Sequence, residues 1–170
     1  DVSKLMTLIR YSYGGLDAVV NNAAILPRSS LERMSLMDWK RAVDVNLSAP
    51  WLVTREALEL MEDGGSIVNM TSGLGWIALQ PYNAYCVTKA GLNMLTRAFA
   101  QELGARYRVN AVDPGVARTR MNPTAEVSAQ AIVPVIRYLV ALGPEGPSGE
   151  CFRKDGTTVD WERTPSLTVA

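Results

Sequence analysis

Three short, nearly continuous apolar runs along this chain predict buried parallel strands. They lie at residues 16–22 (LDAVVNN), 65–72 (GSIVNMTS) and 108–115 (RVNAVDPG), and a weaker fourth run lies at 150–156 (ECFRKDG). Their residues are apolar and often β-branched without regular polar alternation, which is typical of strands covered on both faces. Each of the first three runs ends in small polar residues or Pro-Gly.

Helical periodicity fills the segments between these runs. Residues 35–62 predict a helix that starts at Ser35, with Asp38 at capping-box spacing. Pro50 is expected to kink or divide this helix, because proline cannot donate the backbone hydrogen bond that a helix interior needs.

Two further helices are predicted after the second strand. Residues 83–104 end on Gly104, a typical C-terminal cap, and residues 129–142 form the last helix. Alternating strands and helices predict an α/β fold with a parallel sheet. Ligands of such sheets bind beyond the carboxyl ends of the strands, so the polar strand ends are the places where a site is expected.

The composition narrows the chemistry open to this chain. Basic and acidic residues number 17 each, which gives no reason to expect a nucleic acid or a membrane surface as partner. With no histidine, serine–histidine, cysteine–histidine and histidine–metal sites are excluded. Cys86 and Cys151 form no metal-spaced pair, so no metal site is expected and a reducing, cytoplasmic location fits.

Tyr85 and Lys89 are candidates for acid–base chemistry. They are four residues apart and therefore share one face of the predicted helix. A phenol titrates at about pH 10, and a neighbouring ammonium is expected to lower its pKa. Ser72, at a strand end, supplies a hydroxyl that can hydrogen-bond a carbonyl or alkoxide oxygen. The Tyr-x-x-x-Lys pattern alone is weak evidence, because many surface helices carry it.

Five ordered motifs strengthen this interpretation. They are NNAA (21–24), DVNL (44–47), NMTSG (69–73), YCVTK (85–89) and NAVDPGVARTRM (110–121). Together they resemble the short-chain dehydrogenase/reductase family, and GPSGECFRKDG followed by Trp161 resembles the end of a carbonyl-reductase-like branch. The resemblance runs from Asp1 to Trp161. It implies a Rossmann-like doubly wound parallel sheet in three α/β/α layers.

The resemblance implies four catalytic residues. Tyr85 would be the general acid or base, and Lys89 would lower its pKa and bind the nicotinamide ribose. Ser72 would stabilise the developing oxyanion, and Asn46 would hold a water that links Lys89 to solvent. Two alternatives stay open: Asn46 could be a buried amide paired to backbone, and Ser72 could simply end its strand.

The resemblance also implies a dinucleotide cofactor, NADP or NAD, with NADP favoured. Asp1 and Val2 resemble the end of the family's third strand, where the acidic residue meets adenine. Asn22 would lie on the adenosine side, whereas Asn21 is expected to be a structural strand tie. The nicotinamide end would be contacted by Tyr85, Lys89, Pro114, Gly115, Val116, Ala117 and Thr119.

The family's glycine-rich phosphate turn has no counterpart in this sequence. The only early glycine cluster, YGG at 13–15, precedes a strand instead of following one. We expect residues 1–170 to be one Rossmann-like domain, the C-terminal portion of the sheet, without the N-terminal β-α-β-α-β portion. The whole protein would then have about 240 to 250 residues. Residues 16–22 would form an edge strand with exposed apolar surface.

The leading functional hypothesis is an NAD(P)-dependent oxidoreductase that interconverts a ketone or aldehyde and an alcohol. Only nine residues separate Thr119 from the last helix, which predicts a small lid over the site. Trp76, Leu79 and Tyr82 could line a substrate pocket or merely cover the core. Cys86 is expected to pack as a small apolar residue.

Other functions and the assembly stay open at this point. Without the phosphate turn, the chain could be a non-catalytic assembly or interaction module. An epimerase or dehydratase on the related extended fold is disfavoured, because the sequence after Gly115 is too short for a large substrate domain. Helices 35–62 and 83–104 could pair copies into a homodimer or homotetramer, although related branches can be monomeric.

Overall fold

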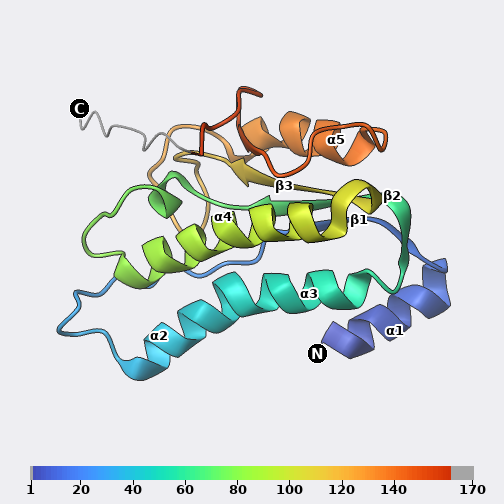
Figure 1. The fold of residues 1–170 in the computed structure, drawn as a ribbon. Helices are drawn as coiled ribbons and strands as arrows, with labels where there is room; N and C mark the ends of the chain where they lie inside the picture. The colour runs from blue at the N-terminus through green and yellow to red at the C-terminus, as the bar shows by residue number, and fades with distance from the viewer. Residues whose placement is uncertain (1, 162–170) are drawn as a thin grey trace.

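Four parallel strands form one sheet in the computed structural model, which describes residues 2–161. Their order in the sheet is β1-β2-β3-β4, and they span Leu16–Asn21, Met61–Met70, Tyr107–Asp113 and Cys151–Arg153. The main helices are α1 (Val2–Tyr13), α2 (Leu36–Val43), α3 (Ala49–Ala57), α4 (Asn83–Leu103) and α5 (Val133–Ala141). Helices α1, α3 and α4 lie on one side of the sheet and α5 on the other (Figure 1). The prediction of a Rossmann-like α/β sheet is confirmed.

Two apolar clusters fill the space on either side of this sheet. Ile67 belongs to the cluster shared with α1, α3 and α4, and the next residue, Val68, belongs to the cluster under α5. Both side chains are fully buried. Successive side chains of a strand point to opposite faces, so Ile67 and Val68 of β2 fill the clusters on the two sides of the sheet.

The register of the strands brings their carboxyl ends to one edge of the sheet. Asn21 pairs with Asn69 and Met70 pairs with Val112. Asp113, the last residue of β3, is aligned with Arg153 of β4. The segments that follow β1, β2 and β3 therefore leave the sheet at the same edge.

A buried polar ladder joins this edge to the helices beneath it. The Asn21 amide donates to Asn69 Oδ1 at 2.8 Å and to Thr54 Oγ1 at 3.2 Å. Asn69 Nδ2 donates to Thr96 Oγ1 of α4 at 3.0 Å. Buried polar groups must find such partners, since an unsatisfied one costs about 1–3 kcal/mol. Asn21 ties β1 to β2, as predicted.

The helix predicted at 35–62 is divided, but not at Pro50 itself. Ser35 Oγ caps α2 by accepting the Asp38 N–H at 3.0 Å, as its position in the sequence predicted. A π-helical turn at Asp44–Ser48 then separates α2 from α3. Pro50 lacks the N–H that would bond the Asn46 carbonyl four residues earlier, so the irregular turn lies on the N-terminal side of the proline.

The end of that predicted helix was wrong. Helix α3 ends at Ala57, and Met61 already pairs with Leu16 in the sheet. Leu60 and Met61 are buried in the cluster beside α1. Burial of these side chains and pairing of the strand outweigh the helical propensity of the local sequence.

The opening residues also differ from expectation. Val2 is the first described residue of α1 and packs against the same cluster as Met6, so the expected strand end is wrong there. Asp1 lies outside the described residues. Val2, Met6 and Ile9 follow helical spacing, which explains why this segment is helical.

Strand β1 lies at an edge of the sheet formed by the described residues, as expected. Val19 is buried, whereas Val20 is 40% exposed. The segment after β3 has no helix of its own before the 3₁₀ turn at Ala129–Ile132, which agrees with a small lid. No helix among residues 2–161 has the length and apolar character needed to cross a membrane.

Candidate active site

Ser72, Tyr85 and Lys89 meet at the edge where the strands end. Ser72 follows β2, and its Oγ accepts the Leu74 N–H at 3.2 Å at the start of the turn Gly73–Gly75. Tyr85 and Lys89 lie in the first turns of α4. The turn packs directly on α4: a Cβ on Gly75 would lie 2.5 Å from Asn93 Nδ2 and 3.0 Å from the Lys89 carbonyl oxygen.

Lys89 is an unusually buried cation. Its side chain is 3% exposed, and Nζ donates to the Met70 carbonyl oxygen at 2.6 Å. Nζ also lies 5.6 Å from the centroid of the Tyr85 ring. Burial lowers the pKa of Lys89 to about 8, because an ammonium loses hydration in the interior.

Tyr85 keeps its proton at neutral pH in this structure. Burial raises its pKa, a hydrogen bond with Ser72 lowers it, and the negative charge of Asp113 raises it further. The expected net direction is therefore wrong: the Tyr85 pKa is raised here, not lowered. The Lys89 ammonium bonds to Met70 and lies over the ring face, and the loss of hydration at the phenol is the larger effect.

Asn46 lies at the centre of the π-helical turn and is completely buried. Its Oδ1 accepts the Ile25 N–H at 2.8 Å, and its Nδ2 donates to the Ile25 oxygen at 2.9 Å. The same Nδ2 donates to Thr88 Oγ1 at 3.1 Å, next to Lys89. The side chain is thus paired to backbone, which is the alternative left open by the sequence. π-Helical turns occur frequently at functional sites, so the turn itself still marks this region.

The residues expected on the cofactor side follow β1 and β3 at the same edge. Asn22 is exposed directly after β1. Pro114 and Ala117 are half-buried, whereas Gly115, Val116 and Thr119 are exposed. Gly115 has φ +63° and open space around its Cα, and Thr119 Oγ1 accepts the Met121 N–H at 3.1 Å. Val2, in α1, belongs to none of these segments.

The loop between Ser72 and Tyr85 has mixed surroundings. Trp76 packs against the buried residues near β4, and its ring centroid is 5.6 Å from that of Trp161. Leu79 is 44% exposed. Tyr82 lies under the guanidinium of Arg28, whose Nη2 also donates to the Met121 carbonyl at 3.3 Å. Trp76 therefore covers the core, and Tyr82 and Arg28 link three loops around the site.

One charged neighbour of Tyr85 was not singled out from the sequence. Asp113 lies within the motif NAVDPG and acts on the Tyr85 pKa through its charge. A carboxylate directly before Pro-Gly at a strand end was the available signal. Among residues 2–161 no group of acidic, cysteine or histidine side chains could hold a metal ion.

The sequence matches known proteins over most of its length. Residues 1–146 match a family profile described as enoyl-(acyl carrier protein) reductase. A 3beta-hydroxysteroid dehydrogenase 1 from Eggerthella lenta is 34% identical over 144 residues, which cover 79% of this chain and 55% of that protein. A 3-oxoacyl-(acyl-carrier-protein) reductase from Synechocystis is 35% identical over 144 residues, covering 81% and 58%. The chain spans little more than half the length of these two relatives.

The fold is likewise similar to solved structures. The crystal structure of a blue fluorescent protein from a metagenomic library in complex with NADPH has a TM-score of 0.83 and 29% identity to this chain. The match covers 91% of this chain and 70% of that chain. Residues 1–146, which match the family profile, include Ser72, Tyr85 and Lys89.

Proposed function

Because this chain belongs to the short-chain dehydrogenase/reductase family, we propose that it interconverts a ketone or aldehyde and an alcohol with NAD(P) as cofactor. The observation that carries this proposal is the group formed by the half-buried Tyr85 phenol and Ser72 hydroxyl and the buried Lys89 ammonium. The NADPH bound by a similar solved structure favours NADP over NAD.

The residues at the strand ends suit the nicotinamide end of such a cofactor. Pro114, Gly115, Val116, Ala117 and Thr119 would hold it together with Asn22 on the adenosine side. In support, the Cα of Gly115 is open to solvent and Val116 is 70% exposed, so a flat ring can approach the backbone there. When bound, the reduced cofactor supplies a hydride to the carbonyl carbon.

The protein side chains handle the proton and the charge on oxygen. Tyr85, which is protonated at neutral pH, donates its proton to the carbonyl oxygen. Ser72 donates a hydrogen bond to the same oxygen as negative charge develops there. The Lys89 ammonium then faces the phenolate that Tyr85 becomes and stabilises it.

We assign Asn46 a supporting role in returning the proton. Its side chain is used by Ile25 and Thr88, so the proposed water would be held by the backbone of the π-helical turn. Pro50 supports this, because it removes the N–H that would otherwise bond the Asn46 carbonyl.

Replacement of Tyr85 tests the proposal. With NADPH and a panel of simple ketones, Tyr85→Phe should lower kcat by about 10²- to 10⁴-fold. Tyr138→Phe, on the exposed surface of α5, is the matched control. Unchanged turnover in Tyr85→Phe would remove Tyr85 from the mechanism.

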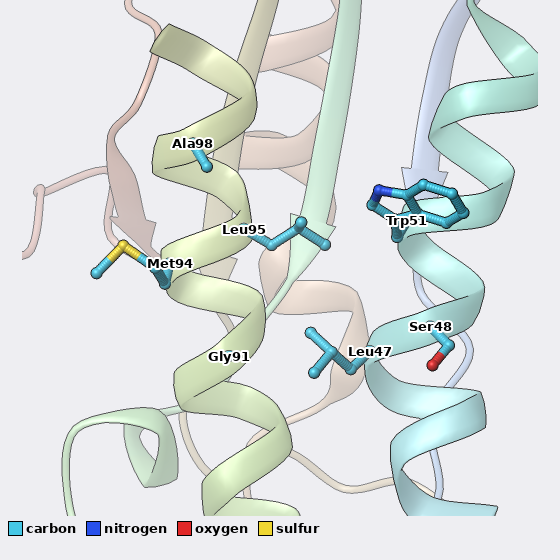
Figure 2. A pocket seen from close by; sticks show the side chains of 7 residues that line it. All are labelled: Leu47, Ser48, Trp51, Gly91, Met94, Leu95 and Ala98. Atoms are coloured by element: carbon cyan, nitrogen blue, oxygen red, sulfur yellow. The ribbon is translucent and has the colours of Figure 1, made fainter. Parts of the chain in front are cut away.

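A groove between α3 and α4 supports self-association, the second proposal for this chain. Leu47 and Trp51 lie across it from Leu95 (Figure 2), and Met94 of α4 also lines it. Its lining is almost entirely apolar and shares no residue with the catalytic set: Leu47, Ser48, Trp51, Gly91, Met94, Leu95 and Ala98. We propose that a second copy of the chain covers it, giving a homodimer or homotetramer.

The same groove would serve a non-catalytic assembly module. Titration with NADPH and NADH, followed by nicotinamide fluorescence, separates the two functions. Saturable binding supports the enzyme, and a folded chain that binds neither supports the module. The free thiols of Cys86 and Cys151 agree with the reducing, cytoplasmic location that we propose.

A further inference from the structure

Asp113 places a carboxylate beside the proposed catalytic group. It is the last residue of β3 and is half-buried. Its Oδ1 accepts the Gly115 N–H at 2.9 Å and so holds the Pro114–Gly115 turn. Its Oδ2 faces Gly73, lying 3.5 Å from where a Cβ on that glycine would be. Within residues 2–161, Oδ2 has no hydrogen-bond partner of its own.

Asp113 forms no ion pair in the described part of the chain. None of the three ion pairs found there includes it. Arg153, its neighbour across the strands, donates Nη1 to the Thr158 carbonyl at 3.1 Å. The Lys89 ammonium is bonded to Met70.

The remaining neighbours of Asp113 on this face are neutral. Burial and the nearby carboxylate raise the pKa of the Cys151 thiol, so it stays protonated. The Tyr85 phenol is protonated as well. A substrate held between Ser72 and Tyr85 therefore meets one carboxylate oxygen that is free to accept a hydrogen bond.

We propose that Asp113 is a specificity-determining residue that selects carbonyl substrates bearing a protonated amine and excludes those bearing a carboxylate. This inference rests on the proposed function of the same site. An ammonium can both donate to the free Oδ2 and neutralise the charge, and charge-assisted hydrogen bonds are about twice as strong as neutral ones. A substrate carboxylate would meet a like charge in a partly desolvated place.

A purely structural role for Asp113 would be to cap the Pro114–Gly115 turn. Asp113→Asn separates the two roles, because the amide oxygen still accepts the Gly115 N–H while the charge is lost. Glu102→Gln, on the exposed surface near the end of α4, is the matched control for a loss of negative charge.

Three six-membered ketones of similar shape serve as probes. They are 1-methyl-4-piperidone, 4-methylcyclohexanone and 4-oxocyclohexanecarboxylate, tested with NADPH below neutral pH, where the amine is protonated. The neutral ketone shows any general loss of activity in a variant. Selectivity is therefore the kcat/KM of a charged ketone divided by the kcat/KM of the neutral ketone. Wild-type protein should prefer the amine. Asp113→Asn should lower that ratio on the order of 10- to 100-fold and raise the ratio for the carboxylate.

Equal ratios in wild type and Asp113→Asn would overturn the proposal while leaving the proposed function intact, provided that the neutral ketone is reduced. If wild-type protein reduces none of the three ketones, the proposed function fails instead. Binding of 1-methyl-4-piperidone by calorimetry then decides on Asp113 separately. Weaker binding in Asp113→Asn than in Glu102→Gln supports the inference, and equal binding overturns it.

Discussion

The ammonium of Lys89 donates a 2.6 Å hydrogen bond to the main-chain oxygen of Met70, the last residue of β2. This bond joins α4 to the strand that precedes Ser72. Lys89 is only 3% exposed, so its ammonium has lost most of its hydration and has this one hydrogen bond in its place. The arrangement places Lys89 where the proposed chemistry needs it, at a cost to the stability of the fold.

Replacing Lys89 by methionine should therefore stabilise the protein while abolishing its activity. Methionine fills a similar volume without a charge, so the variant avoids the cost of burying an ammonium. The Met70 carbonyl oxygen loses its hydrogen bond, and this loss cancels only part of that stabilisation. We expect Lys89→Met to raise the free energy of unfolding at neutral pH by roughly 1–3 kcal/mol. Urea denaturation followed by tryptophan fluorescence measures this.

The same comparison has a defined pH dependence. The folded-state pKa of Lys89, about 8, lies below its unfolded value, so between them the unfolded state binds more protons. The burial penalty is fully present below pH 8 and is relieved as pH rises, so the advantage of Lys89→Met should shrink towards alkaline pH. Lys40→Met, on exposed α2, should show a difference that stays flat. A Lys89→Met protein that is less stable than wild type at neutral pH would refute the penalty.

The rate of ketone reduction should fall as pH rises through about 8, because Lys89 then loses the proton that stabilises the Tyr85 phenolate. The pH profile of kcat/KM with NADPH measures this alkaline fall in rate. Ser72→Ala should lower the rate at every pH and leave the fall at the same pH, since Ser72 does not titrate in this range. A profile that stays level well above pH 8 would show that Lys89 is not the titrating group.

Much of the fold followed from the sequence because burial on both faces leaves a visible signature. Ile67 and Val68 in one run, and Ala111 and Val112 in another, are successive apolar residues, as a strand covered on both faces favours. The prediction for the start of the chain was wrong at Val2. The resemblance of Asp1 and Val2 to a strand end was given more weight than the helical spacing of Val2, Met6 and Ile9.

The sequence predicted which residues form the candidate site better than it predicted their pKa values. Ser72, Tyr85 and Lys89 come together as the motifs implied, but the Tyr85 pKa depends on burial, which no motif encodes. Likewise, spacing alone did not reveal that Asn69 links Asn21 to Thr96, because those partners come from three separate elements.

Gly75 should be intolerant of even a methyl group. A Cβ there would lie 2.5 Å from Asn93 Nδ2 and 3.0 Å from the Lys89 backbone, which cannot easily move within α4. Gly75→Ala should therefore push the Ser72 turn away from Tyr85, costing about 1–3 kcal/mol of stability and lowering kcat more than it raises KM.

Thermal unfolding and ketone-reduction kinetics measure the two effects of Gly75→Ala. Gly143→Ala is the control, because nothing lies within 4 Å of its Cβ position. Equal behaviour of the two variants would mean that the turn can shift without disturbing the site.

Met94 offers the sharpest test of self-association, because it lines the apolar groove and is 59% exposed. If a second copy covers the groove, Met94→Glu would bury an unpaired carboxylate in the interface, which costs roughly 2–4 kcal/mol. We expect analytical ultracentrifugation to show wild-type dimers or tetramers and a shift of Met94→Glu towards monomer. Tyr11→Glu changes a residue on α1 that is even more exposed and lies outside the groove, and it should leave the assembly unchanged. Wild-type protein that stays monomeric at high concentration would leave the groove without a second copy and would favour the monomeric organisation considered from the sequence.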